Sequence, residues 1–338
     1  MFKRASAAAA AIFFLAAGAA RADDVVRLGN LKFAHYGAIS YMKEIAPKFG
    51  LKIDEKQFAK GADIYPAMAV DQIDISASGA DGAVAARGNG VKLYVVAGFA
   101  NGGVRILKRP DLDAVKTLKD VKGLKVATVR GGTQDLMLLA ELDKHGMTWG
   151  ERAGKDVQLI YFNNYADLNQ ALAQKYVDVI CQSEPQSTQA ISAGWGVEVV
   201  KPYDTPIGIP VRPLVMTEKM YNEKPEIAAR VLKLFVAATK AFIDDPALAE
   251  KYVRESVFKG QLSSQDFRDG MANANYTYDV PAGHMQTTTD YMMKYGLGKM
   301  VTPPKSDAEW VKTDLLDKAK ADLGIKADLG IKAEPKNP

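Results

Sequence analysis

The stretch "LKVATVRGGTQDLMLL" (residues 124–139) decides the fold class of this chain. Its first six residues favour a buried strand, and two glycines then lead into an amphipathic run that favours a helix. A strand that passes through a tight turn into a helix is the repeating unit of a parallel α/β sheet. The first-turn amides of such a helix can also bind an anion, so this motif marks a candidate ligand site.

The same alternation of strands and helices continues along the chain, which predicts an α/β protein with parallel sheets. The predicted strands cover residues 25–34, 51–58, 74–78, 92–100, 124–129, 157–162 and 177–182. The predicted helices cover residues 41–50, 63–70, 83–90, a run from 133, 166–175 and 225–245. The proline-rich segment 203–217 predicts no long regular structure but a crossing or hinge between lobes.

Length and charge bound the class of protein. The chain has 338 residues, more than one hydrophobic core usually serves, so we expect two lobes. It carries 44 basic and 40 acidic side chains, and three of the basic ones lie within residues 1–22. The remaining charges nearly balance, which argues against a nucleic-acid or membrane-surface role.

The first 22 residues have the features of a secretory signal peptide. Lys3 and Arg4 precede a short apolar core, and the small residues Ala20 and Ala22 flank Arg21 before the predicted cleavage point after Ala22. No later segment has the roughly 18 uninterrupted apolar residues of a membrane span. The single cysteine, Cys181, can form neither an internal disulfide nor the lipidated first residue of a lipoprotein. We therefore expect a soluble periplasmic protein.

Common enzyme motifs are missing from the sequence. The turn at residues 130–135 lacks the Gly-Lys-Ser/Thr ending of a phosphate-binding loop, and no G-x-G-x-x-G follows the first strand. Neither a G-x-S-x-G elbow nor an H-E-x-x-H zinc motif occurs, and the chain has only three histidines. We therefore expect no catalytic residues, no metal site and no cofactor.

Four stretches in order along the chain resemble a known family. They are "AMAVDQIDISASGADG" (67–82), "TLKDVKGLKVATVRGGTQ" (117–134), "ALAQKYVDVICQSEP" (171–185) and "EKMYNEKPEIAARVLKLFVAATKAFIDDPALA" (218–249). Their order and spacing are similar to those of the nitrate, sulfonate, taurine and thiamine-pyrimidine family of solute-binding proteins, which serve ABC importers. The resemblance covers most of the chain after residue 22.

This resemblance implies a two-lobed type II periplasmic binding protein fold with a ligand cleft between the lobes. The implied division is a signal peptide (1–22), a first lobe in two parts (23–107 and 214–318), an inserted second lobe (108–213) and a polar tail (319–338). The tail contains the hexapeptide KADLGI twice, at 320–325 and 326–331, which we interpret as an exposed duplication. Hinge crossings are implied near residues 104–107 and 212–215.

Loops at the ends of the first and third predicted strands supply the first candidate ligand contacts. The resemblance places a contact at His35 and Tyr36, which could offer a ring donor and a stacking face, although a histidine packed at a strand end is the alternative. It places a second contact loop at Ser78 and Gly79. Asp81 follows this loop and either caps the next helix or binds a ligand that has hydrogen-bond donors.

The remaining candidates follow later strands or lie at the second crossing. At the opening motif, Gly132, Thr133 and Gln134 could bind a ligand oxygen, with Thr133 predicted as the helix N-cap. Phe99 could cover a ligand, and Asn164 could bind it or merely cap a helix. Two charged candidates complete the set, Glu184, which could face the cleft or begin a helix, and Arg212, which could clamp an oxyanion or pair with a surface acid.

These features predict a monomeric substrate-binding protein that is not an enzyme. It would capture a sulfonate, carboxylate or aromatic anion by hinge closure and deliver it to an inner-membrane ABC permease with its ATPase. A pyrimidine-like nitrogen heterocycle is the alternative ligand, supported by Asp81 and Glu184. Alternatives of another class are an enzyme like the thiamine-pyrimidine synthases, whose cysteine cluster Cys181 alone cannot reproduce, and a periplasmic sensor.

Overall fold

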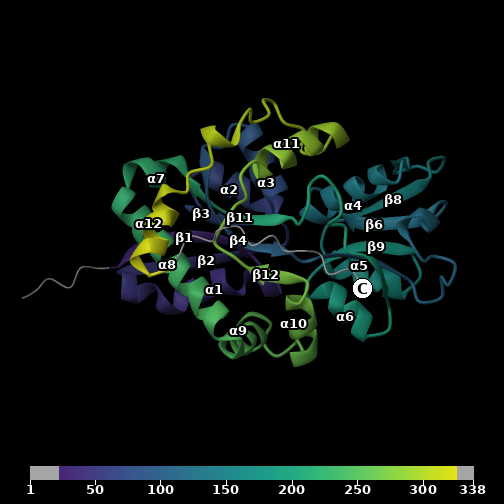
Figure 1. Cartoon of the computed structure of the whole chain (residues 1–338), viewed down its shortest axis with the longest axis horizontal. Helices are drawn as coiled ribbons and strands as arrows, with labels where there is room; N and C mark the ends of the chain where they lie inside the picture. Colours follow the sequence, from purple (N-terminus) through teal and green to yellow (C-terminus); the bar gives the residue numbers. More distant parts are fainter. Residues whose placement is uncertain (1–22, 326–338) are drawn as a thin grey trace, which may run out of the picture.

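The computed structural model describes residues 23–325, so the predicted signal peptide and the second KADLGI copy lie outside the described residues. The described chain forms two six-stranded sheets, each covered by helices, and we call each sheet with its helices a lobe (Figure 1). No helix in residues 23–325 is long and apolar enough to cross a membrane.

The sheet of the first lobe combines strands from both ends of the described chain. Its order is β12-β4-β11-β3-β1-β2. Strand β1 pairs in parallel with β2 and β3, with Val26 opposite Ile53 and Leu28 opposite Ile75, whereas β11 runs antiparallel between β3 and β4. The strands are β1 (Asp24–Leu31), β2 (Leu51–Phe58), β3 (Ile75–Ala77), β4 (Leu93–Gly102), β11 (Val211–Thr217) and β12 (Ala274–Tyr276).

The sheet of the second lobe is built from the middle of the chain in the order β10-β5-β9-β6-β8-β7. Central strand β6 pairs in parallel with β8 and β9, and Ala127 lies opposite Ile160 on one side and Ile180 on the other. The strands are β5 (Val104–Lys108), β6 (Lys125–Val129), β7 (Trp149–Gly150), β8 (Val157–Phe162), β9 (Val179–Ser183) and β10 (Val197–Val200).

Amphipathic helices cover both sheets, as the apolar periodicity predicts. Those of the second lobe are α4 (Thr133–Lys144), α5 (Ala166–Ala173) and α6 (Gln186–Ser192). The remaining helices are α1 (Gly37–Ile45), α2 (Ile64–Ala69), α3 (Ala80–Gly88), α7 (Glu218–Glu223), α8 (Pro225–Asp244), α9 (Pro246–Tyr252), α10 (Ser264–Met271), α11 (His284–Tyr295) and α12 (Asp314–Asp322). The predicted strand at 157–162 and the long helix from residue 225 are confirmed.

The proline-rich segment 203–217 differs from its prediction. Residues 211–217 form β11, which is wholly buried and lies between two partners inside the first sheet. Pro213 cannot donate a ladder hydrogen bond, and the pairing with β4 shifts register between Arg212 and Pro213. The irregular pairing explains how a central strand tolerates this proline.

The chain crosses between the lobes at other residues than predicted. Strand β5 lies in the second sheet, although residues up to 107 were assigned to the first lobe, and β11 begins in the first sheet before residue 214. The first crossing lies at Gly102 and Gly103, whose φ angles of 74° and 76° favour glycine. The exact domain boundaries stay a prediction.

The start of the predicted exposed tail is also different. Helix α12 continues to Asp322, so the first KADLGI copy begins inside a packed helix. Lys320 is only 5% exposed, and its ammonium pairs with the Asp279 carboxylate at 2.8 Å.

The core of the second lobe holds Cys181, which is fully buried with its Sγ 3.3 Å from the Gln134 carbonyl oxygen.

Candidate functional site

Loops from the two lobes enclose a small cavity, which we call the cleft cavity. Its volume is about 20 Å³, enough for one or two water molecules. It is lined by Leu31, Phe33, Tyr36, Gly61, Gly79, Asp81, Gly82, Gly131, Gly132, Thr133, Gln134, Tyr165 and Arg212. The cavity lies where strand-end loops of the two sheets meet, the usual place for a ligand in α/β proteins.

The only cation in this lining is Arg212, near the start of β11. It is 2% exposed, and among residues 23–325 neither Nη1 nor Nη2 has a hydrogen-bond partner. A buried guanidinium whose terminal nitrogens lack hydrogen-bond acceptors is costly unless a ligand supplies them. Arg212 therefore offers two donors and a positive charge to an oxyanion.

The single carboxylate in the lining, Asp81, joins the two lobes. The hydroxyl of Thr133 on α4 donates to Asp81 Oδ1 on α3 at 2.7 Å. Burial raises the pKa of Asp81, whereas this hydrogen bond and the charge of Arg212 lower it. A Cβ at Gly79 would clash with both contacting side-chain oxygens, so glycine allows the lobes to approach here.

The start of α4 differs from the predicted capping arrangement. Gly132, not Thr133, is the N-cap, and Thr133 begins the helix. The amide of Gly131 donates to Asp135 Oδ2 at 3.1 Å, and the Tyr161 hydroxyl donates to Oδ1 at 3.1 Å. Burial raises the pKa of Asp135 to about 6 although both hydrogen bonds oppose it. The helix thus uses one backbone donor of the Gly-Gly turn for its own carboxyl group.

Aromatic rings form one wall of the cleft cavity. The ring centroids of Tyr36 and Phe99 are 4.7 Å apart, and Phe33 lies 5.1 Å from Tyr165. The Tyr165 hydroxyl donates to Gln134 Oε1 at 3.0 Å, which joins the wall to α4. Tyr36, a predicted ligand contact, lines the cavity, whereas Phe99 is only 1% exposed and packs against the Tyr36 ring.

His35 is not among the residues that line the cavity. It is fully buried, and within the described part of the chain neither ring nitrogen has a hydrogen-bond partner. Burial, assisted by the positive charge of Arg212, holds its pKa well below the usual value. Its ring packs beside the crossing, where a Cβ at Gly103 would lie 3.0 Å from Cε1.

Ser78 and Asn164 are also outside the cavity lining. The Ser78 hydroxyl is hydrogen-bonded to that of Tyr65. Asn164 Oδ1 accepts from the amide of Asp167 at 3.0 Å, and Asn164 Nδ2 donates to the Asp167 carboxylate at 2.7 Å. Both side chains thus have local structural roles, as the alternative for Asn164 allowed.

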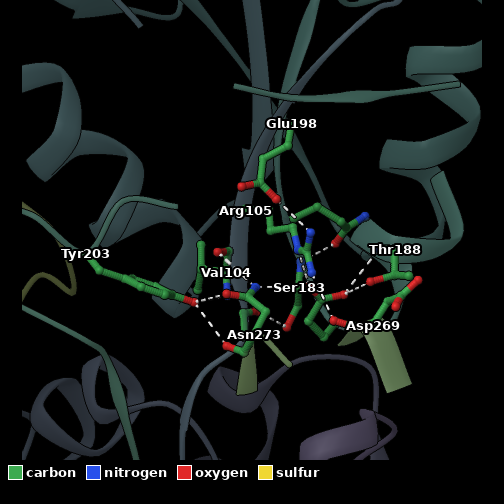
Figure 2. A network of polar contacts seen from close by, with 11 residues as sticks. Val104, Arg105, Ser183, Thr188, Glu198, Tyr203, Asp269 and Asn273 are labelled. Atoms are coloured by element: carbon green, nitrogen blue, oxygen red, sulfur yellow. Dashed lines mark hydrogen bonds and ion pairs between the residues drawn. The ribbon is translucent and has the colours of Figure 1, made fainter. Parts of the chain in front are cut away.

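Glu184 is not among the residues that line the cavity. It is hydrogen-bonded to members of a polar network between the lobes that includes Arg105, Thr188 and Asn273 (Figure 2). Its buried carboxylate accepts from Arg105 Nε at 2.5 Å, from the Thr188 hydroxyl at 2.7 Å and from Asn273 Nδ2 at 3.0 Å. Arg105 also donates to Glu198 at 2.6 Å and to the Asp269 carbonyl oxygen at 3.0 Å. Glu184 is therefore neutralised by protein groups and not presented to the cavity.

The cavity also contains residues that the sequence-based prediction leaves out. Leu31 and Phe33 lie just before the predicted contact at His35, and Gly131 adjoins the predicted Gly132. Gly61 and Gly82 complete this group. In residues 23–325 no group of three or more His, Cys, Asp or Glu side chains could hold a metal ion.

Comparisons with known proteins agree with this architecture. The model of the NMT1-like family matches residues 23–255. No curated protein sequence matches the chain.

Solved structures match over most of the chain. The ligand-binding component of an ABC-type import system from Staphylococcus aureus, with zinc bound, gives a TM-score of 0.73 at 15% identity and covers 88% of this chain and 99% of that one. The alkanesulfonate-binding protein of Xanthomonas axonopodis pv. citri bound to MOPS gives a TM-score of 0.69 at 20% identity and covers 86% of this chain and 98% of that one. The periplasmic nitrate-binding protein of Synechocystis PCC 6803 gives a TM-score of 0.70 at 17% identity and covers 90% of each chain. The predicted two-lobed fold of periplasmic binding proteins is confirmed.

Proposed function

Because this chain belongs to the NMT1-like family, we propose that it is the substrate-binding component of an ABC importer and captures a small organic anion between its lobes. In this proposal it is exported to the periplasm, catalyses no reaction and hands its ligand to an inner-membrane permease with its ATPase. The printed names of similar structures, which include an ABC import component and sulfonate- and nitrate-binding proteins, support this role.

The observation that carries the anion is the buried guanidinium of Arg212, whose two terminal nitrogens have no hydrogen-bond partner within residues 23–325. A sulfonate or carboxylate would accept from its two terminal nitrogens and neutralise its charge. With most of a small ligand buried, we expect a dissociation constant of about 0.1–10 μM.

Hinge closure would couple binding to delivery. The Asp81–Thr133 hydrogen bond already joins the lobes at the cavity. A ligand that touches Arg212 in the first lobe and the start of α4 in the second favours the closed form through contacts that the open form lacks. The permease would then recognise this closed form.

A nitrogen heterocycle is the second candidate ligand, and Asp81 is the observation in its favour. The Asp81 carboxylate lines the cavity and could accept from a ring N–H or amino group. Glu184, the other acid on which this alternative depended, is occupied by Arg105.

A thermal-shift screen tests these proposals. The purified protein is mixed with sulfonates, carboxylates, nitrate, aromatic acids and pyrimidines. A true ligand at roughly 100 times its dissociation constant stabilises the protein by about 2.7 kcal/mol, a shift of several degrees. A response to organic anions that is lost in Arg212→Met supports the anion proposal, a response to pyrimidines alone favours the heterocycle, and no response to any compound contradicts both.

A further inference from the structure

A second, larger cavity lies beside the cleft cavity and is lined in part by α11; we call it the α11 pocket. Its volume is about 340 Å³, within the range of small-molecule sites. Its lining is mainly apolar and includes Tyr65, Ala85, Ala86, Val91, Met292 and Leu297. These side chains come from α2, α3, α11 and the segments that follow α3 and α11.

Helix α11 contacts both lobes. It lies above α3 and α4 in Figure 1 and contacts both helices. Its last turn is attached to the second lobe, because Lys294 Nζ and the Tyr295 hydroxyl donate to the Asp143 carboxylate of α4 at 2.6 and 3.0 Å. Gly296, with φ of 68°, ends the helix and returns the chain toward α3.

The two cavities are neighbours that share part of their lining. Asp81, Gly82, Gly131 and Gly132 line both of them. Three of these four residues lack a side chain, so the only side chain that the shared residues contribute is the Asp81 carboxyl group. A ligand group held in the cleft cavity could therefore extend between α3 and the Gly-Gly turn into the α11 pocket.

The sizes and polarities of the cavities are complementary. The cleft cavity has the Arg212 guanidinium, whose terminal nitrogens lack partners in the described part of the chain, but a volume of only about 20 Å³. The α11 pocket has a volume of about 340 Å³ and a mainly apolar lining. We infer that the two form one ligand site, in which Arg212 binds the oxyanion and the α11 pocket holds an apolar body. The ligand is then an organic oxyanion with an aliphatic chain or a ring, not a bare inorganic ion. This inference rests on the proposed function.

Isothermal titration calorimetry with two homologous series tests it. The purified protein is titrated with straight-chain alkanesulfonates and alkanecarboxylates of increasing length. Removing each added methylene from water should strengthen binding roughly threefold to fourfold until the pocket is full. Ala85→Leu, which narrows the pocket from α3, should abolish this increase with chain length. The affinity of the same variant for methanesulfonate or acetate reports whether its cleft cavity is still formed. The control Ala229→Leu introduces the same side chain on α8, away from the residues that line either cavity.

The outcomes separate the inference from the proposed function. Equal affinity for short and long anions, or an unchanged length dependence in Ala85→Leu, overturns the one-site inference and leaves the anion-binding proposal standing. Binding of no member of either series, with Ala229→Leu and the unaltered protein both folded by circular dichroism, overturns the proposed anion function itself. A length dependence lost only in Ala85→Leu supports both.

Discussion

Two buried arginines in this protein have opposite surroundings. The side chain of Arg105 is 12% exposed and donates to Glu184, to Glu198 and to a backbone carbonyl of the first lobe. Arg212 is 2% exposed, and no hydrogen-bond partner for its terminal nitrogens exists among the described residues. Both guanidinium groups have lost much of their hydration, but among residues 23–325 only Arg105 forms ion pairs with carboxylates in exchange. The comparison teaches that a buried charge with partners holds structure, whereas one without them is ready for a ligand.

The largest expected effect is on stability when the partnered charge is removed. Arg105→Met leaves the Glu184 carboxylate buried without its cation, so we expect the free energy of unfolding to fall by about 3–5 kcal/mol. Urea denaturation measures this change. The matched control Lys240→Met removes an exposed ion pair with Asp244 on α8 and should cost under about 1 kcal/mol. Equal losses in the two variants would contradict the structural role of Arg105.

Arg212→Met should weaken ligand binding and leave the stability of the ligand-free protein intact. We expect ligand affinity to weaken by about 2–5 kcal/mol, because a charged hydrogen-bonding partner of a buried ligand is lost. Stability without ligand should stay the same or rise, since an unpaired buried charge is replaced by an apolar side chain. Calorimetry and urea denaturation on the same preparation check both expectations. A loss in the free energy of unfolding as large as that of Arg105→Met would show that Arg212 has a structural role instead.

Asp135 sharpens the comparison because it is a buried acid whose hydrogen-bond donors, Gly131 and Tyr161, are neutral. Burial raises its pKa to about 6, from an ordinary value of 3.8. Between about pH 4 and pH 6 the Asp135 carboxyl group therefore keeps its proton in the folded state but loses it in the unfolded state. The free energy of unfolding accordingly falls as the pH rises through this range and does not recover above it. We expect a loss of roughly 2 kcal/mol between pH 4 and pH 7 from this group. In Asp135→Asn this contribution should disappear from urea denaturation measured across the window, and an unchanged pH profile would contradict it.

The smallest effect is expected at Asp81, and its sign distinguishes the two ligand classes. Asp81→Asn keeps an oxygen that can accept from Thr133 but removes a negative charge from the cavity. An anion should then bind about three- to tenfold more tightly at neutral pH, since a repulsion of about 1 kcal/mol is removed. A heterocycle that donates to the carboxylate should instead bind at least about tenfold more weakly. Calorimetry with the hit from the thermal-shift screen decides between them.

Local sequence patterns predicted the parts of the fold that depend on contacts between residues close together in the sequence. Alternating strands and helices, and the stop at Gly50 with φ of 62°, follow from side-chain periodicity and backbone freedom. The strand at Val211–Thr217 was missed because prolines favour irregular structure. Its partners β3 and β4 lie more than a hundred residues away, and a register shift at Pro213 is a property of that pairing.

The same limit applies to the site. Strand-end positions, the predicted second crossing and the family resemblance together selected Tyr36, Asp81, Thr133 and Arg212, which line one cavity. It could not predict the orientation of Glu184, whose partners Arg105 and Asn273 are 79 and 89 residues away along the chain. Whether a charged side chain reaches a ligand or another residue depends on contacts that form only when distant segments pack.

The buried thiol of Cys181 makes it simple to attach a fluorescent label at one chosen position of this protein. Because the side chain is fully buried and burial raises its pKa well above the usual value, it should react slowly with maleimides. The chain contains no other cysteine. A cysteine placed on the exposed surface of α11 could thus carry a fluorophore at one defined position, with no need to remove the native residue. Lobe movement would then be reported as a change in light emission, in real time and without a labelled ligand.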